Sequence, residues 1–157
     1  MTISIDEERP DSRDAVTLIA ELDEYLHQLN YPPESVHTYS PEQLISEGFI
    51  FLVARMDDEP VACGGVKLVG KDYAEVKRMF VRRAFRRLGL AKLILDRLES
   101  VARKAKIKTL RLETGIWQPE AIGLYERSGF QRRGPFAGYQ EDPTSVYFEK
   151  SLDGLIA

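Results

Sequence analysis

Residues 75–92 read Glu-Val-Lys-Arg-Met-Phe-Val-Arg-Arg-Ala-Phe-Arg-Arg-Leu-Gly-Leu-Ala-Lys, and this stretch decides the fold. Val76 and the run Met79–Val81 are apolar and predict a buried strand. The segment 82–87 that follows is basic. Apolar residues then recur at helical spacing, which predicts one face for packing on a sheet: Leu90, Ile94, Leu98, Val101 and Ala105. The stretch therefore predicts a strand, a basic turn containing a glycine, and the start of a helix.

A helix start of this kind is suited to binding phosphate. The first N–H groups of a helix lack partners within the helix and lie at the positive end of its dipole. Arg86 and Arg87 precede the predicted start, and Lys92 lies in its first turn. We expect the backbone of residues 88–91 to hold an anion, with these three cations as supporting partners.

Two segments together carry a resemblance to a known family. The first, Arg86-Arg87-Leu88-Gly89-Leu90-Ala91, resembles the Arg/Gln-x-x-Gly-x-Gly/Ala pattern with which the GNAT (Gcn5-related) N-acetyltransferases bind the pyrophosphate of acetyl-CoA. The second, residues 118–130, is similar to the family segment Asn-x-x-Ala-x-x-Leu-Tyr-x-x-x-Gly-Phe. This chain departs from that segment by carrying Gln118 where many members carry Asn. The resemblance covers roughly residues 49–150 and implies a mixed sheet that is splayed where the cofactor inserts.

The length and the pattern of apolar residues predict one α/β (mixed α+β) domain over residues 1–157. The resemblance implies that residues 1–48 form helices on the acceptor side and that residues 49–150 form the cofactor-binding core. A mostly antiparallel sheet of six or seven strands and about four helices are expected. The predicted strands are 2–8, 49–55, 61–69, 73–81, 109–114, 130–133 and 144–150. The predicted helices are 14–29, 41–47, 89–106 and 119–128.

Three finer expectations concern these elements. The first helix should bury one face made of Val16, Ile19, Leu22, Leu26 and Leu29. The pair Gly64-Gly65 inside a strand predicts a bulge or a close approach to the backbone. The loop 134–143 is long enough to border a site.

The resemblance implies roles for individual residues in moving an acetyl group to an amine. Glu75 is the candidate base, acting directly or through a water, and its structural alternative is an ion pair with Lys77 or Arg111. Tyr125 is the candidate acid for the leaving thiolate, and its alternative is aromatic packing of a helix on the sheet.

The resemblance also implies binding roles. Residues expected at acetyl-CoA are Met79, Phe80, Val81, Arg86, Arg87, Leu88, Gly89, Leu90, Ala91, Lys92 and Gln118, the strand residues acting through their backbone as an oxyanion hole does. Lys77 and Arg78 border the acceptor side, where they could contact a substrate carboxylate, and Tyr31 lies in the expected acceptor region. Such an acceptor would be amino-acid-like.

Composition and charge narrow the function classes. Residues 1–60 hold 14 acidic and 3 basic side chains, whereas residues 61–157 hold 11 acidic and 19 basic ones, which suits an enzyme that joins a polyanionic cofactor to a cationic amine. With a pI of about 5.5 and no exposed aromatic residues expected among the arginines of 82–87, nucleic-acid binding is disfavoured. The two histidines lack the spacing of a metal site, so no metal is expected.

The remaining expectations concern location and alternatives. The single Cys63 suits a reducing compartment, and no signal peptide or membrane span is expected, which favours a cytoplasmic protein. The primary expectation is an acetyl-CoA-dependent N-acetyltransferase acting on an amine of a small molecule or of a protein. The alternative is a module that senses acyl-CoA without turnover. A homodimer is an analogy with the family.

Overall fold

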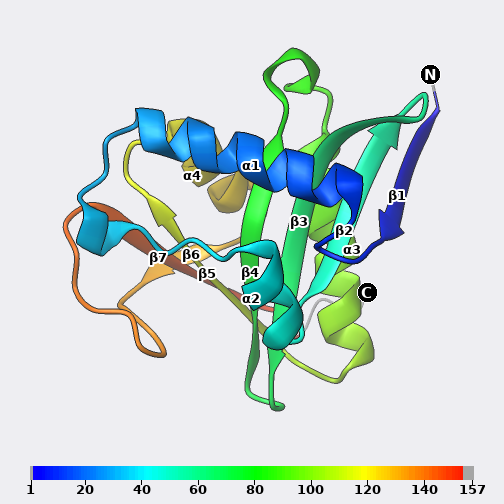
Figure 1. Cartoon of the computed structure of the whole chain (residues 1–157). Helices are drawn as coiled ribbons and strands as arrows, with labels where there is room; N and C mark the ends of the chain where they lie inside the picture. Colours follow the sequence, from blue (N-terminus) through cyan, green and yellow to red (C-terminus); the bar gives the residue numbers. More distant parts are fainter. Residues whose placement is uncertain (1, 154–157) are drawn as a thin grey trace.

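The computed structural model describes residues 2–153, whose centre is one seven-stranded sheet with the strand order β1-β2-β3-β4-β5-β7-β6 (Figure 1). Adjacent strands are antiparallel except β4 and β5, which run parallel. The strands are β1 (Ile3–Glu7), β2 (Ile50–Met56), β3 (Glu59–Val69), β4 (Tyr73–Val81), β5 (Thr109–Gly115), β6 (Gln131–Arg133) and β7 (Ser145–Ser151). The mixed, mostly antiparallel sheet predicted from the sequence is confirmed.

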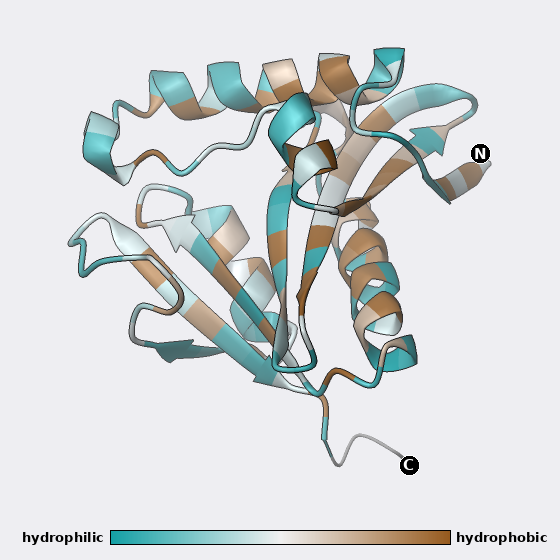
Figure 2. Ribbon diagram, turned by 60° about the horizontal axis from the view of Figure 1, so that its bottom comes forward, coloured by the Kyte–Doolittle hydropathy of each residue, from teal (hydrophilic) through white to brown (hydrophobic). Residues whose placement is uncertain are grey.

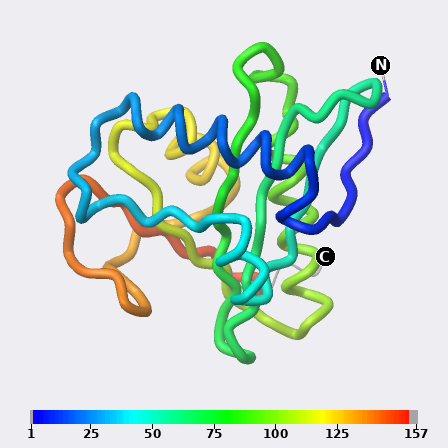
Figure 3. Tube along the Cα trace, viewed as in Figure 1, coloured from blue at the N-terminus to red at the C-terminus, as the bar shows by residue number. Residues whose placement is uncertain are grey.

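Helices cover both faces of the sheet (Figures 1 and 3). The α-helices of the described residues are α1 (Arg13–Gln28), α2 (Pro41–Ser46), α3 (Leu90–Lys104) and α4 (Pro119–Arg127). Helices α1 and α2 cover one face, and α3 and α4 pack on the other. Two 3-10 turns, η1 (Pro33–Ser35) and η2 (Arg83–Phe85), escape sequence analysis because three residues are too few to show a period.

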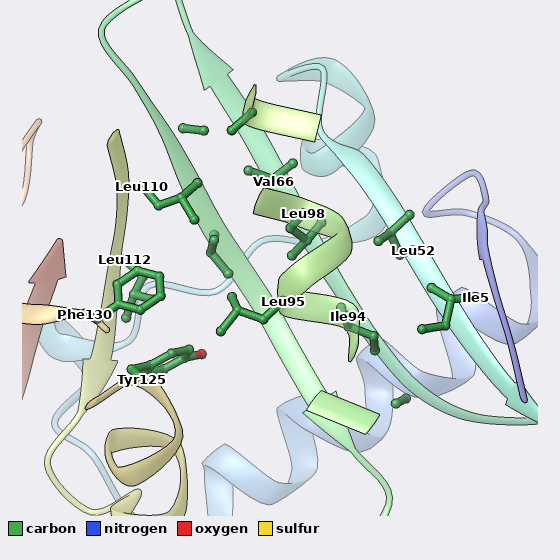
Figure 4. Packing of buried hydrophobic residues seen from close by; sticks show 14 of the residues in the cluster. Ile5, Leu52, Val66, Ile94, Leu95, Leu98, Leu110, Leu112, Tyr125 and Phe130 are labelled. Atoms are coloured by element: carbon green, nitrogen blue, oxygen red, sulfur yellow. The ribbon is translucent and has the colours of Figure 1, made fainter. Parts of the chain in front are cut away.

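Helix α3 forms the main core with β2, β3, β4 and β5. Its apolar side faces the sheet, as the brown stripe in Figure 2 shows, and Leu98 and Ile94 are fully buried there (Figure 4). Gly64 on β3 makes the close approach possible, because a Cβ atom at this position would lie 2.4 Å from the Met79 sulfur and 2.9 Å from Ile94. The expectation of a close approach to the backbone at this glycine pair is confirmed.

Helix α1 docks on the other face through a stripe shifted from the predicted one. Ser12 caps its start by accepting a hydrogen bond from the Ala15 N–H at 3.1 Å. The fully or nearly buried positions are Ala15, Leu18, Ile19 and Leu22. Val16, predicted on the buried face, is 42% exposed. The prediction for Val16 was wrong because Ala15, whose small side chain permits close contact, faces the sheet instead.

The acidic residues of the N-terminal region are paired with arginines of the sheet. Arg55 on β2 holds both Glu8 and Asp14 at 2.8 Å. Arg82 holds Glu21 at 2.7 Å. The charge asymmetry of the sequence thus helps dock α1 on the sheet, and these carboxylates are not free to attract a cationic substrate.

Strands β4 and β5 pair only briefly and then separate. Their paired positions are Ala74 with Leu110 and Glu75 with Arg111. Beyond Arg111, β5 keeps its pairing with β7 on its other side. The edge of β4 that faces β5 therefore has no partner strand beyond Glu75, and its backbone polar groups are available to a ligand.

Candidate functional site

A cavity of about 1140 Å³ opens where β4 and β5 separate. Its walls come from β4, the end of β5, the C-terminal half of α1 with the loop after it, the start of α3, and α4. One end is lined by Arg86, Arg87, Gly89, Leu90, Ala91, Lys92, Gln118, Ala121 and Tyr125, and the other by Tyr31, Ser35, His37, Thr38, Lys77, Arg78, Glu113, Thr114 and Thr144. Most residues singled out in the sequence therefore line one space.

The start of α3 has the features of an anion site. Gly89 is its N-cap residue with φ +81°, and no side chain caps the helix. The N–H groups of residues 88–92 make no hydrogen bond within the described residues, the first N–H bonded back being that of Leu93 to the Gly89 carbonyl. A Cβ atom at Gly89 would meet nothing within 4 Å, so the space in front of these donors is open. The donor set fits the pyrophosphate of coenzyme A.

The predicted cations differ in how they are placed. Arg86 donates from Nε to the Val81 carbonyl at 3.1 Å and lies over the Tyr25 ring, so it is held at the cavity wall. Arg87 is exposed and adopts φ +67°. Lys92 pairs with Asp96 at 2.6 Å, which reduces its availability to an anion. Leu88 is 48% exposed and, unlike its neighbours, does not line the cavity.

The strand segment 79–81 also lies at the cavity, next to the register shift between β3 and β4. The pairs Gly65–Lys77 and Cys63–Phe80 flank this shift, so two residues of β4 lie opposite Gly64 alone. All three residues of the segment line the cavity. Their placement on the unpaired edge of β4 suits backbone donors to a carbonyl oxygen.

Tyr125 both packs and lines the cavity. Its ring contacts Phe130 and Phe148 at centroid distances of 5.6 and 6.0 Å, and it is 5% exposed. Burial raises the pKa of the Tyr125 hydroxyl, which therefore stays protonated at neutral pH. Gln118, at the N-cap position of α4, lines the same end of the cavity.

Glu75 lies at the closed end of the opening, where β4 and β5 still pair. It is 6% exposed and does not line the cavity. Its carboxylate accepts a hydrogen bond from the Tyr139 hydroxyl at 2.6 Å and lies 3.5 Å from the Lys77 ammonium. Of the two structural alternatives, the ion pair with Lys77 is present, whereas Arg111 pairs with Glu149 at 2.8 Å.

Glu113 lines the cavity, as do the carboxylates Asp23 and Glu120 nearer the surface, and the sequence analysis does not select it. It lies two residues beyond Arg111, in the part of β5 that has left β4. The Ser145 hydroxyl donates to its Oε2 atom at 2.9 Å. Burial raises the pKa of Glu113, while the positive charge of Lys77 opposes the rise. The alternation of residues along β5 indicates which face of the sheet Glu113 lies on. Only the parallel pairing of β5 with β4, which ends at Arg111, reveals that Glu113 reaches the cavity.

Lys77 pairs with Glu75, and its positive charge also acts on Glu113. Its ammonium is 3.5 Å from Glu75 and lies over the rings of Tyr39 and Tyr139 at about 5 Å. Burial lowers the pKa of Lys77, and the two nearby carboxylates oppose this effect. Loop 134–143 contributes Tyr139 to this cluster, although no residue of the loop lines the cavity.

Tyr31 lies at the end of the cavity that Lys77, Arg78 and Glu113 also line. Its hydroxyl accepts a hydrogen bond from the Trp117 N–H at 2.9 Å, and the two rings lie 4.6 Å apart. A Cβ atom at Gly115 would lie 2.0 Å from the Tyr31 hydroxyl, so this ring rests on the bare backbone of β5. Tyr31 therefore ties the loop after α1 to the end of β5.

Two kinds of feature are not found in residues 2–153. No group of three or more His, Cys, Asp or Glu side chains is arranged to hold a metal ion. No helix in this part of the chain is long and apolar enough to cross a membrane.

Comparison with family models and curated proteins gives consistent results. The model of the acetyltransferase (GNAT) family matches residues 16–130. An IAA acetyltransferase of Azospirillum brasilense is 42% identical over 151 residues, covering 96% of this chain and 98% of the relative. The YsnE protein of Bacillus subtilis, named an uncharacterized N-acetyltransferase, is 37% identical over 89% of this chain and 93% of its own length.

Solved structures agree with this fold. A Klebsiella pneumoniae protein with a provisional acyl-CoA N-acyltransferase name is 36% identical, with a TM-score of 0.81 over 96% of this chain and 98% of the other. The PaiA N-acetyltransferase of Thermoplasma acidophilum, solved with coenzyme A, has a TM-score of 0.77 at 20% identity over 96% of this chain and 99% of its own, a similarity of fold.

Proposed function

Because the chain belongs to the GNAT acetyltransferase family, whose members use acetyl-CoA, we propose that it moves the acetyl group of acetyl-CoA to a primary amine of a small molecule. The amine attacks the thioester directly while both substrates are bound. The observation that carries the proposal is the cavity that joins the free N–H groups at the start of α3 to the half-buried carboxylate of Glu113 on β5.

The first half of the proposal concerns the cofactor. The N–H groups of residues 88–92 bind the pyrophosphate, with Arg86 and Arg87 adding positive charge. The pantetheine arm runs along the unpaired edge of β4 toward Gln118. Backbone N–H groups of residues 79–81 polarise the thioester carbonyl and stabilise the negative charge that develops on its oxygen.

The second half concerns the amine, which must lose a proton to act as a nucleophile. An amine with a pKa of about 10.4 is neutral in roughly one molecule in 2500 at pH 7, a deficit of about 4.6 kcal/mol. Glu113 lines the cavity and is the carboxylate we assign to accept this proton. The family resemblance implies Glu75 as the base. In this proposal Glu75 instead positions Lys77 through an ion pair.

The thiolate of coenzyme A leaves when the tetrahedral intermediate collapses. Tyr125 donates a hydrogen bond from its hydroxyl to this thiolate, and because burial raises the pKa of the hydroxyl, its proton stays largely on the tyrosine. A thiol with a pKa of about 8.5 is already a fair leaving group, so this help is modest.

Calorimetric titration with acetyl-CoA tests the cofactor half. The wild type is expected to bind in the micromolar range, and Gly89→Glu is expected to lose binding because its carboxylate faces the pyrophosphate. Gly89→Ala is the matched control, because it imposes the same backbone strain at φ +81° without adding charge. Equal binding by the Glu and Ala variants would contradict the placement of the pyrophosphate.

An amine panel with thiol detection tests turnover. IAA, for which the Azospirillum relative is named, is tested beside the amines as a separate acceptor. Binding of acetyl-CoA without acetylation of any amine would favour the alternative, an acyl-CoA sensor.

A further inference from the structure

Arg78 is placed at the acceptor end of the cavity by an irregularity in β4. Glu75 and Lys77 face the α1 side of the sheet, and Val76 and Met79 face the α3 side. Strict alternation would direct Arg78 toward the α3 core. The extra residue opposite Gly64 breaks the alternation, so Arg78 follows Lys77 onto the same side, where it pairs with Asp23 of α1.

The backbone is strained at this residue. Arg78 adopts φ +62°, a left-handed conformation that is unfavourable for a residue with a side chain. Bulges beside active sites commonly redirect a side chain in this way. The strain is thus tied to the direction of one guanidinium group.

The guanidinium group is buried but not fully paired. Its side chain is 3% exposed and lines the cavity. Asp23 accepts from its Nη2 atom, and Nε is enclosed by protein without a hydrogen-bond partner within the described residues, whereas Nη1 makes no hydrogen bond there and is not enclosed. A buried donor without an acceptor is unfavourable, and a guanidinium group matches a carboxylate with two parallel hydrogen bonds. The neighbouring cation, Lys77, is already held by Glu75.

We propose that Arg78 binds a carboxylate of the acceptor, so that the enzyme acetylates small amines that also carry a carboxylate group. This inference rests on the proposed acetyltransferase function. The amine faces Glu113, and the carboxylate accepts a hydrogen bond from Nη1 of Arg78, the donor that the protein leaves free at the cavity. An amino acid carries both of these groups, with its amine either on the α carbon or farther from the carboxylate.

The test uses matched acceptors that differ only in the carboxylate. Each amino acid of the panel is compared with its amide and with its decarboxylated amine, and ω-amino acids of increasing length report the spacing between the two groups. The acid is expected to exceed its amide in kcat/KM by at least about tenfold, mainly through KM, because a charged hydrogen bond is lost in the amide.

Two variants separate binding from structure. Arg78→Gln and Asp23→Asn both break the ion pair between α1 and β4. Arg78→Gln is expected to bring the ratio of acid to amide to about one, because it lowers activity on the acids far more than on the acceptors that lack a carboxylate. Asp23→Asn is expected to retain the preference for acids. An equal effect of both variants on the ratio would mean that Arg78 only docks α1, and would overturn the proposal.

The remaining outcomes are also decisive. Amides turned over as well as acids by the wild type would overturn this inference and leave the acetyltransferase function intact. If no amine is acetylated, N-acetyl amino acids are titrated into the complex with coenzyme A by calorimetry. Binding lost in Arg78→Gln and kept in Asp23→Asn supports the carboxylate site, and absence of binding to the wild type overturns it.

Discussion

Glu75 lies opposite Arg111 at the position where the pairing of β4 with β5 ends. Two residues farther along each strand, Lys77 and Glu113 line the cavity that the separation creates. The same pair of parallel strands thus closes the core on one side and opens the site on the other. Glu75 belongs to the closed end and Glu113 to the open end, which separates two carboxylates that look equivalent in the sequence.

Replacement of Glu113 by Gln is expected to lower kcat about 100-fold, because the amine loses its base. Glu75→Gln changes a residue that pairs with Lys77 and does not line the cavity, so it is expected to lower kcat less. Steady-state kinetics with saturating acetyl-CoA measures both. A larger loss for the Glu75 variant would return the role of base to that residue.

The pH dependence of kcat provides a second test of Glu113. A base works only when deprotonated, so activity is lost as the pH falls through its pKa, which burial raises above the ordinary range of a glutamate. Lys77, His37 and Ser145 face this carboxylate, and the charge of Lys77 holds its pKa down. Lys77→Met is therefore expected to move the acidic limb to higher pH. An unchanged limb would show that another group titrates.

Tyr125→Phe removes a hydroxyl and keeps the ring that packs on Phe130 and Phe148. We expect kcat to fall about tenfold, since the thiolate leaves readily without a strong acid. Tyr73→Phe, at a buried tyrosine outside the cavity, is the control. Equal kcat values for the two variants would leave Tyr125 a packing role alone.

Gly115→Ala is expected to displace the Tyr31 ring, because the new Cβ atom would lie 2.0 Å from its hydroxyl. The KM for the acceptor should rise while the binding of acetyl-CoA measured by calorimetry stays the same. Gly138→Ala, in a loop with nothing within 4 Å, should change neither quantity. Loss of acetyl-CoA binding in Gly115→Ala would show that Tyr31 supports the whole cavity.

Leu98→Ala should destabilise the protein by about 3 kcal/mol, because this fully buried side chain joins α3 to the sheet. Leu93→Ala lies on the exposed side of the same helix, where Leu93 is 41% exposed, and should cost less than about 1 kcal/mol. Urea unfolding gives both values. Similar costs at the two positions would contradict the assignment of the helix face.

The sequence by itself determined the order of the elements and the geometry of the site that we propose for the cofactor. Residues 75–92 are contiguous, so their periodicity and the glycine at the helix start place strand, turn and free N–H groups without knowledge of distant contacts. Ser12 and Ser40 likewise mark helix starts through hydrogen bonds to residues three positions on.

Only the tertiary structure decided the acceptor half. Glu113 and Lys77 line one cavity because β4 and β5 are parallel neighbours that separate. Helix α1 is docked by arginines far from it in the sequence. The direction of Arg78 depends on one extra residue opposite Gly64, which reverses the facing that alternation predicts. Local patterns record the period of each element, whereas pairing register and strand separation are set by contacts between elements.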